Sequence, residues 1–192
     1  PGQVHGDFSL NVTNSITATD ILRDPFGRVA EDLPALLAGL DAETLLWRPD
    51  PEANSIGWLA WHLTRVQDDH LAGVGQVEQV WPTQGFAQAF GLPYAVGSIG
   101  YGHTSADVAA FTVTDVDLLC RYHAAVHDLT LRVLDGLDAG GDTAYARVVD
   151  ERWDPPVTAA VRLVSVVGDT TAHVGQIGYL RGMAERREAG LS

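Results

Sequence analysis

The sequence predicts an all-α protein, a four-helix bundle, and three observations lead to this fold class. Apolar residues recur every three or four positions in four long segments, which is the pattern of amphipathic helices with one buried face. No segment shows the convincing alternation of apolar and polar residues that predicts β-strands. A long connection rich in glycine separates the second and third helical segments, and this leaves room for a crossover between helices of a bundle.

The first helix is expected over residues 17–40. Its apolar positions are Ile21, Leu22, Phe26, Val29, Leu33, Leu36, Leu37 and Leu40. Pro25 fits only if the helix starts late or bends there, and Pro34 should kink it as well. Asp41 can cap a short helical turn that follows, with Glu43 in its first turn, where the helix dipole favours an acidic side chain.

The second helix is expected to start at a cap, Asn54 or Ser55, and to run to about Val74. Its high apolar content predicts that it is largely buried. Residues 75–113 then form a long structured connection, because glycines and a proline recur there among aromatic residues. These breakers are Gly85, Gly91, Pro93, Gly97, Gly100 and Gly102. A long ordered loop of this kind is often functional.

The third helix is predicted to open at Thr114, with Asp117 in its first turn, and to end within residues 136–141, where glycines cluster. The fourth helix is expected over residues 157–188, which contain almost no breaker except glycine. The double proline just before this segment suits a helix start.

The length and composition predict one globular domain. A chain of 192 residues with 46% hydrophobic side chains supports one full-sized core, which we assign to residues 17–192. Residues 1–16 have no sustained period and are expected to be a flexible arm or a remnant that is not native. The net charge of −13, with no cluster of Lys and Arg, argues against nucleic acid as a partner.

Two further features concern the environment of the chain. No apolar run reaches the roughly 18 residues of a membrane span, so no span is expected. The single cysteine, Cys120, cannot form an internal disulfide, and no signal segment opens the chain, which predicts a cytoplasmic protein. Cys120 lies in an apolar-rich segment and is interpreted as an inert core thiol.

A metal site is suggested by acidic and imidazole side chains on two predicted helices. Asp169 and His173 are four residues apart, so their side chains lie about 40° apart around the helix axis and can reach one ion together. His62 on the second helix is placed to supply a third ligand. Two imidazoles and one carboxylate leave a coordination position open, as in catalytic sites, and zinc is the first choice of ion.

Alternatives to this site remain open at the level of the sequence. Asp169 and His173 can form a simple salt-bridged pair, and His62 can be a core histidine without a ligand. His123 and His127 form a competing pair with the same spacing on the third helix. The remaining histidines, His5, His70 and His103, are interpreted as tail, surface or loop residues without a metal role.

Several segments together resemble the DinB-like four-helix superfamily, and within it the actinobacterial mycothiol S-transferases. The segments are NSIGWLAWHLTRVQDDH, IGYGHTSADV, YHAAVHDLTL, RWDPPVTAAVRLVSVVGD and HVGQIGYLRG. The similarity covers roughly Asp20 to Met183, and the combination of segments is far more specific than any one of them.

The resemblance implies that a divalent metal is bound at positions matching His62, Asp169 and His173. Many members of the superfamily have a histidine where this chain has Asp169, but the carboxylate version resembles mycothiol-dependent maleylpyruvate isomerase. The implied activity is transfer of mycothiol, a sugar-linked thiol held by the metal as a thiolate, to small electrophiles in detoxification. A homodimer is a further expectation from the family.

Other residues are candidates for contacts around this site. Arg65 and Asp69, one and two turns beyond His62, are candidates for orienting ligands or substrate, and Asp69 can also pair with Arg65. Arg162 is a candidate contact of the thiol. Tyr101 and Trp153 are candidates for the walls of the substrate pocket.

Two rival functions follow from the same residues. The first is an isomerase that uses the metal and mycothiol to rearrange a small unsaturated diacid, for which the sequence offers few cationic residues near the site. The second is a four-helix module that dimerises or binds a partner without catalysis. A stable thioether product separates the transferase from the isomerase, and metal analysis separates both from the module.

Overall fold

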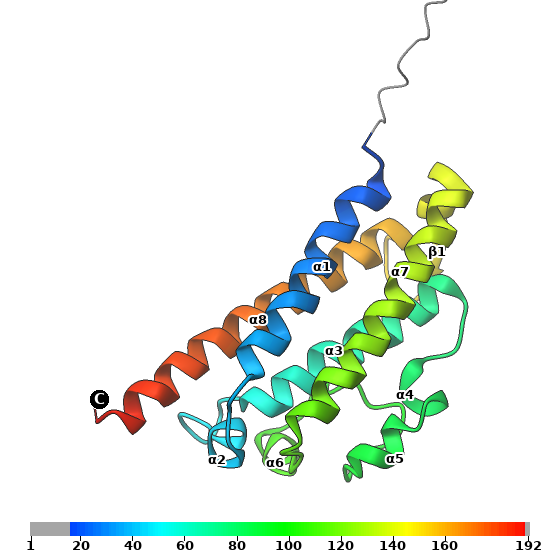
Figure 1. The fold of residues 1–192 in the computed structure, drawn as a ribbon. Helices are drawn as coiled ribbons and strands as arrows, with labels where there is room; N and C mark the ends of the chain where they lie inside the picture. The colour runs from blue at the N-terminus through cyan, green and yellow to red at the C-terminus, as the bar shows by residue number, and fades with distance from the viewer. Residues whose placement is uncertain (1–15, 191–192) are drawn as a thin grey trace, which may run out of the picture.

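The computed structural model describes residues 16–190 and confirms an all-α four-helix bundle. The four long helices are α1 (Ala18–Leu37), α3 (Ile56–Gly75), α7 (Val116–Ala146) and α8 (Ala159–Glu188). α1 and α3 each pack against both α7 and α8, so the four helices enclose one core (Figure 1). His5 and residues 1–15 of the expected arm lie outside the described residues, as do residues 191–192.

The first helix starts earlier than Pro25 suggests. Thr17 and Asp20 form a capping box that starts α1 at Ala18, and the helix includes both Pro25 and Pro34 before it ends at Leu37. The capping box explains the early start, because it satisfies backbone donors that a helix leaves unpaired at its N-terminus. As predicted, Asp41 caps the short helix α2 (Ala42–Leu46), with Glu43 in its first turn.

The second long helix, α3, is capped by Ser55, whose hydroxyl accepts from the Trp58 N–H. Most of its residues are buried, as its apolar content predicts. The helix ends at Gly75 and is followed by its C-cap, Gln76, which adopts the left-handed conformation (φ 53°) common at helix C-termini.

The long connection between α3 and α7 is ordered and includes three short helices, α4 (Val80–Thr83), α5 (Phe86–Phe90) and α6 (Ser105–Ala109). It packs on the bundle through aromatic side chains, since the rings of Trp81 and Phe90 both contact Tyr122 of α7. This packing fixes the path of the connection along α3. Its last part, residues 97–103, contacts α3 near His62 through hydrogen bonds described below.

The third long helix, α7, begins one residue later than predicted, because Asp115 is the cap and accepts from the Leu118 N–H. Its regular helical conformation is broken at Gly141 (φ 62°, ψ −157°), at the edge of the predicted end. A further difference is a short hairpin of two antiparallel strands, β1 (Val148–Asp150) and β2 (Val157–Thr158), before α8. Thr158 caps α8, which ends at Glu188 as predicted.

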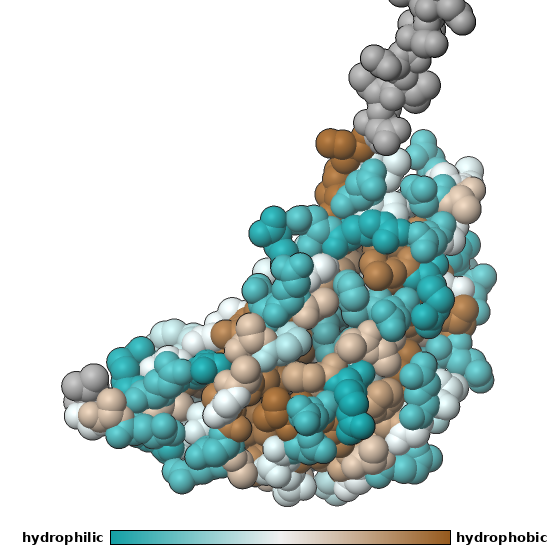
Figure 2. All heavy atoms as spheres, viewed as in Figure 1, coloured by the Kyte–Doolittle hydropathy of each residue, from teal (hydrophilic) through white to brown (hydrophobic). Residues whose placement is uncertain are grey.

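The core contains the apolar faces of the four long helices. Its largest fully buried side chains include Trp61, Tyr122, Phe26, Leu33, Leu63 and Leu119. The face of the molecule in Figure 2 is mainly hydrophilic, with apolar residues showing between the helices. Among the helices of residues 16–190, none combines the length and the apolar character that crossing a membrane requires.

Candidate metal centre

His62, Asp169 and His173 converge between α3 and α8. Each offers one potential ligand atom, and these three atoms lie within 4.8 Å of one another. The ring centroids of the two imidazoles are 4.9 Å apart, with the rings close to perpendicular. Asp169 and His173 are one turn apart on α8, as the spacing predicts, and His62 reaches them from the neighbouring helix. No other group of three such side chains converges within residues 16–190.

Both imidazole rings are oriented by hydrogen bonds at Nδ1. The Nδ1 of His62 lies 2.5 Å from the backbone carbonyl oxygen of Ile99, and the Nδ1 of His173 lies 2.8 Å from the Oε1 of Gln176. A carbonyl oxygen only accepts, so each Nδ1 carries the proton and donates. When such a ring is neutral, its Nε2 keeps the lone pair that binds a metal ion.

Asp169 provides the strongest sign that a partner belongs in this site. Its Oδ1 lies 3.5 Å from the Nε2 of His173, but its Oδ2 is buried and has no hydrogen-bond partner among the described residues. A buried carboxylate oxygen without a partner is costly, and a cation removes that cost. The donor set therefore suits a divalent cation, with one position left for a further ligand.

The electrostatic environment differs between the two imidazoles. Burial lowers the pKa of His62 and favours its neutral form. Burial also acts to lower the pKa of His173, but hydrogen bonds with Asp169 and Gln176 outweigh it and raise the pKa. Neutral His62 is the protonation state that a metal ligand requires.

Gly100, Trp58 and His103 surround His62, and the sequence alone did not mark them as parts of the site. Gly100 has a left-handed backbone (φ +88°), and a Cβ atom there would lie 2.6 Å from the Nδ1 of His62. The Trp58 ring stacks on the His62 ring, with centroids 4.6 Å apart. His103 accepts from the Trp58 indole and contacts Ser98, so it has a structural role in the loop.

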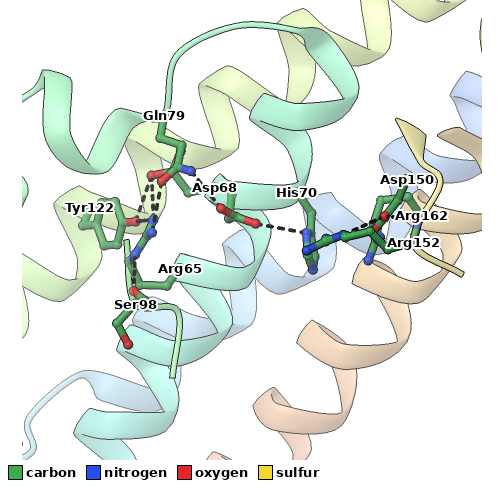
Figure 3. A network of polar contacts seen from close by, with 10 residues as sticks. Arg65, Asp68, His70, Gln79, Ser98, Tyr122, Asp150, Arg152 and Arg162 are labelled. Carbon is green, nitrogen blue, oxygen red and sulfur yellow. Dashed lines mark hydrogen bonds and ion pairs between the residues drawn. The ribbon is translucent and has the colours of Figure 1, made fainter. Parts of the chain in front are cut away.

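Arg65 lies beneath this loop and is fully buried. Its guanidinium contacts four partners, shown in Figure 3: the Ser98 carbonyl, Asp68, Tyr122 and Gln79. The Ser98 carbonyl immediately precedes the Ile99 carbonyl that accepts from His62. Arg65 therefore stabilises the loop that orients the imidazole.

Asp69 does not pair with Arg65, whose carboxylate partner is Asp68. Asp69 accepts from the side-chain amide of Gln79 and lies 3.2 Å from the Nδ1 of His70. Residues three and four positions later both lie on the same side of a helix as Arg65, so either acid could reach its guanidinium. Spacing alone did not distinguish these two acids.

The three residues expected to contact substrate share one pocket of about 510 Å³. We name it the arginine pocket, and its lining includes Asp69, Ile99, Tyr101, Arg152, Trp153 and Arg162. Tyr101 and Trp153 are 88% and 61% exposed, so both rings are available to a ligand. Arg152 was not identified from the sequence, because the hairpin that carries it was not predicted.

The competing pair, His123 and His127, is placed differently. His123 is fully buried in α7, and its Nε2 has no hydrogen-bond partner among the described residues; the same holds for the Nδ1 of His127. Burial, and then the neighbouring His127, lower the pKa of His123 to about 4. No third ligand joins the pair within residues 16–190.

The fold and the convergent triad together define a DinB-like four-helix bundle. The chain belongs to the mycothiol-S-transferase family, whose family model matches residues 21–185. It is also similar to the crystal structure of a conserved protein from Enterococcus faecalis, with 29% identity and a TM-score of 0.79, covering 87% of this chain and 96% of that one. No curated protein matches the chain. The family supports a transferase-type enzyme.

Proposed function

We propose that the protein is a divalent-metal-dependent S-transferase that conjugates mycothiol to small electrophiles. His62, Asp169 and His173 would hold the metal, with zinc as the expected ion. The observation that carries the proposal is the convergence of one potential ligand atom from each of the three residues, together with a buried Oδ2 of Asp169 that has no hydrogen-bond partner among the described residues. The family supports a relation to mycothiol.

The chemistry of thiol transfer explains why such a site is useful. A free cysteine-type thiol has a pKa near ~8.5, and a divalent cation binds it in its deprotonated form. The residues of the chain then have two tasks, which are to hold both imidazoles in place through Nδ1 and to position two substrates against each other. Tyr101, Trp153 and Arg162 are proposed to contact substrate in the arginine pocket, while Arg65 supports the loop above His62.

The activity can be tested directly with purified protein. Metal-free protein is reloaded with Zn²⁺ and incubated with mycothiol, cysteine or glutathione and a reactive halide, and thioethers are detected by mass spectrometry. We expect zinc-dependent conjugation with mycothiol that His173→Ala abolishes and His123→Ala retains. If the zinc-loaded wild type accelerated conjugation of no thiol, the proposal would be wrong.

One observation favours the second candidate function, a mycothiol-dependent isomerase. Arg152 and Arg162 both line the pocket beside the triad, so cationic groups for a diacid are nearer than the sequence suggested. Both guanidinium groups bind Asp150, however, which neutralises part of their charge. The same assay separates the two enzymes, because an isomerase returns the thiol whereas a transferase leaves a stable thioether. A non-enzymatic module predicts neither product nor stoichiometric metal.

A further inference from the structure

Two pockets flank the triad along the junction of α3 and α8. The arginine pocket lies toward the start of α8. A second pocket of about 490 Å³, which we name the amide pocket, lies toward the other end, and its lining includes Glu52, Asn54, Leu59, Gln176 and Tyr179. The two helices are antiparallel, so the triad lies between the pockets.

Each pocket is connected to one metal-ligand candidate by a single hydrogen bond. Gln176 lines the amide pocket and accepts from His173, whereas Ile99 lines the arginine pocket and accepts from His62. A transferase must bring two different molecules to one reacting centre. Two pockets on either side of the triad, each lined by a residue that is hydrogen-bonded to one of its imidazoles, provide a place for each.

The arginine pocket has the chemistry of an anion site with an aromatic wall. The Nη2 of Arg162 donates to Asp150 at 2.8 Å, but its other two nitrogens have no hydrogen-bond partner among the described residues. A guanidinium has five N–H donors, so Arg162, whose side chain is 16% exposed at the pocket, keeps donors for an acceptor there. The side chain of Arg152 is 87% exposed, and the rings of Tyr101 and Trp153 are exposed beside it. Flat apolar surface next to unpaired guanidinium donors suits a planar carboxylate.

The amide pocket has no cationic residue and includes the carboxylate of Glu52. Asn54 and Gln176 offer amide donors and acceptors, and Leu59 supplies apolar surface. The Tyr179 ring is 68% exposed. This lining, mainly apolar with two amides, one carboxylate and no cation, disfavours an anionic thiol such as glutathione and accepts an uncharged molecule that has both apolar surface and hydroxyl groups.

We propose that the electrophile is a flat molecule with a carboxylate, bound in the arginine pocket by Arg162, and that the uncharged sugar part of the thiol occupies the amide pocket. This inference rests on the proposed transferase function. It changes the expected role of Arg162 from contacting the thiol to contacting the second substrate. Arg162 precedes Asp169 by seven residues, about 10 Å along the helix axis, which leaves room for one aromatic ring between the reacting carbon and the guanidinium.

The reaction implied for an aryl chloride is a balanced substitution. The thiolate sulfur forms a bond with the carbon that carries chlorine, and chloride leaves with the electron pair of the carbon–chlorine bond. The proton of the thiol passes to solvent. No oxidant or reductant is needed.

The test compares 4-chloro-3,5-dinitrobenzoate with its methyl ester as electrophiles for the zinc-loaded full chain and mycothiol. We expect Arg162→Gln to lower kcat/KM for the carboxylate about 10- to 100-fold, the usual effect of losing a charged hydrogen bond. The kcat/KM for the ester and the KM for mycothiol should change little. Arg121→Gln, on the exposed side of α7, is the matched control and should leave both unchanged.

A second variant tests the other pocket. Tyr179→Ala should raise the KM for mycothiol several-fold and leave the KM for the electrophile unchanged. If Arg162→Gln affected the carboxylate and the ester equally, or if the two variants exchanged their effects, the assignment of the pockets would be overturned while the transferase function stood. If the wild type conjugated neither electrophile with any thiol, the proposed function itself would fail.

Discussion

Two pairs of side chains with the same spacing differ sharply in their surroundings. Asp169 and His173 on α8, and His123 and His127 on α7, are each separated by one helical turn. The α8 pair meets His62 from α3, and its histidine is oriented through Nδ1. The α7 pair has buried nitrogens without partners and no third ligand. Spacing along one helix therefore supplies only part of a candidate metal site, and a side chain from the neighbouring helix is needed to complete it.

The largest expected effect is the loss of bound metal when a ligand of the triad is removed. His62→Ala and His173→Ala should each reduce zinc to well below one equivalent, because two donors are too few for tight binding. His123→Ala should retain the wild-type zinc content. Metal analysis of the purified variants checks this. Loss of zinc only in His123→Ala would show that the metal is bound on α7 and not between α3 and α8.

A change in the loop over His62 should have the next largest effect. Gly100→Ala places a Cβ atom 2.6 Å from the Nδ1 of His62 at a left-handed backbone position, so the imidazole must move. We expect zinc affinity to fall at least about tenfold, as for other residues that orient metal ligands. Gly102→Ala is the matched control, because it has a similar φ of +75° but meets no atom within 4 Å. Equal zinc affinities in the two variants would contradict this role of Gly100.

Removal of the hydrogen bond to His173 should have a smaller effect on the same site. In Gln176→Ala the imidazole loses its acceptor at Nδ1 and can rotate or change tautomer. We expect zinc affinity to fall about tenfold, at the lower end of the usual range, because Gln176 is exposed and water can replace it. Thr171→Ala on the same helix is the control. Titration with a competing chelator measures both, and unchanged affinity in Gln176→Ala would show that His173 is held in another way.

His123 and His127 on α7 should affect the stability of the fold and not the binding of metal. The pKa of His123 is about 4 in the folded chain, against about 6.5 when unfolded, so the unfolded state binds the proton first as pH falls. The free energy of unfolding therefore falls as the pH is lowered from about 6.5 to 4, and the loss between pH 7 and pH 5 is roughly 2 kcal/mol. His123→Leu should lose less stability over this interval. Urea unfolding at pH 7 and pH 5 measures it, and equal losses in both proteins would contradict a buried neutral His123.

The sequence predicted those parts of the fold that have a local chemical signature. The cap Asp41 is of this kind, and so are the helical periods and the spacing of Asp169 and His173, whereas the cap of α3 was narrowed only to Asn54 or Ser55. The hairpin before α8 was missed because strands of three and two residues are too short to show alternation. The cap of α7 was assigned to Thr114 because the sequence offers two adjacent capping residues, and only backbone geometry selects Asp115.

The parts of the site that the sequence could not predict depend on the backbone and on the tertiary fold. The acceptor for His62 is the carbonyl of Ile99, and every residue type has such a carbonyl. The glycines of residues 97–102 were recognised only as breakers, although Gly100 leaves the space that His62 occupies. Arg152 joins Tyr101 and Trp153 only because the hairpin and the long connection meet beside α8.

The anomalous scattering of zinc in crystals of the zinc-loaded protein tests the central claim most directly. We predict one strong peak bonded to the Nε2 atoms of His62 and His173 and to a carboxylate oxygen of Asp169, with a further position open to solvent or thiol. A peak at His123 and His127, or a triad free of metal in crystals that hold zinc elsewhere, would show that His62, Asp169 and His173 do not form the metal site.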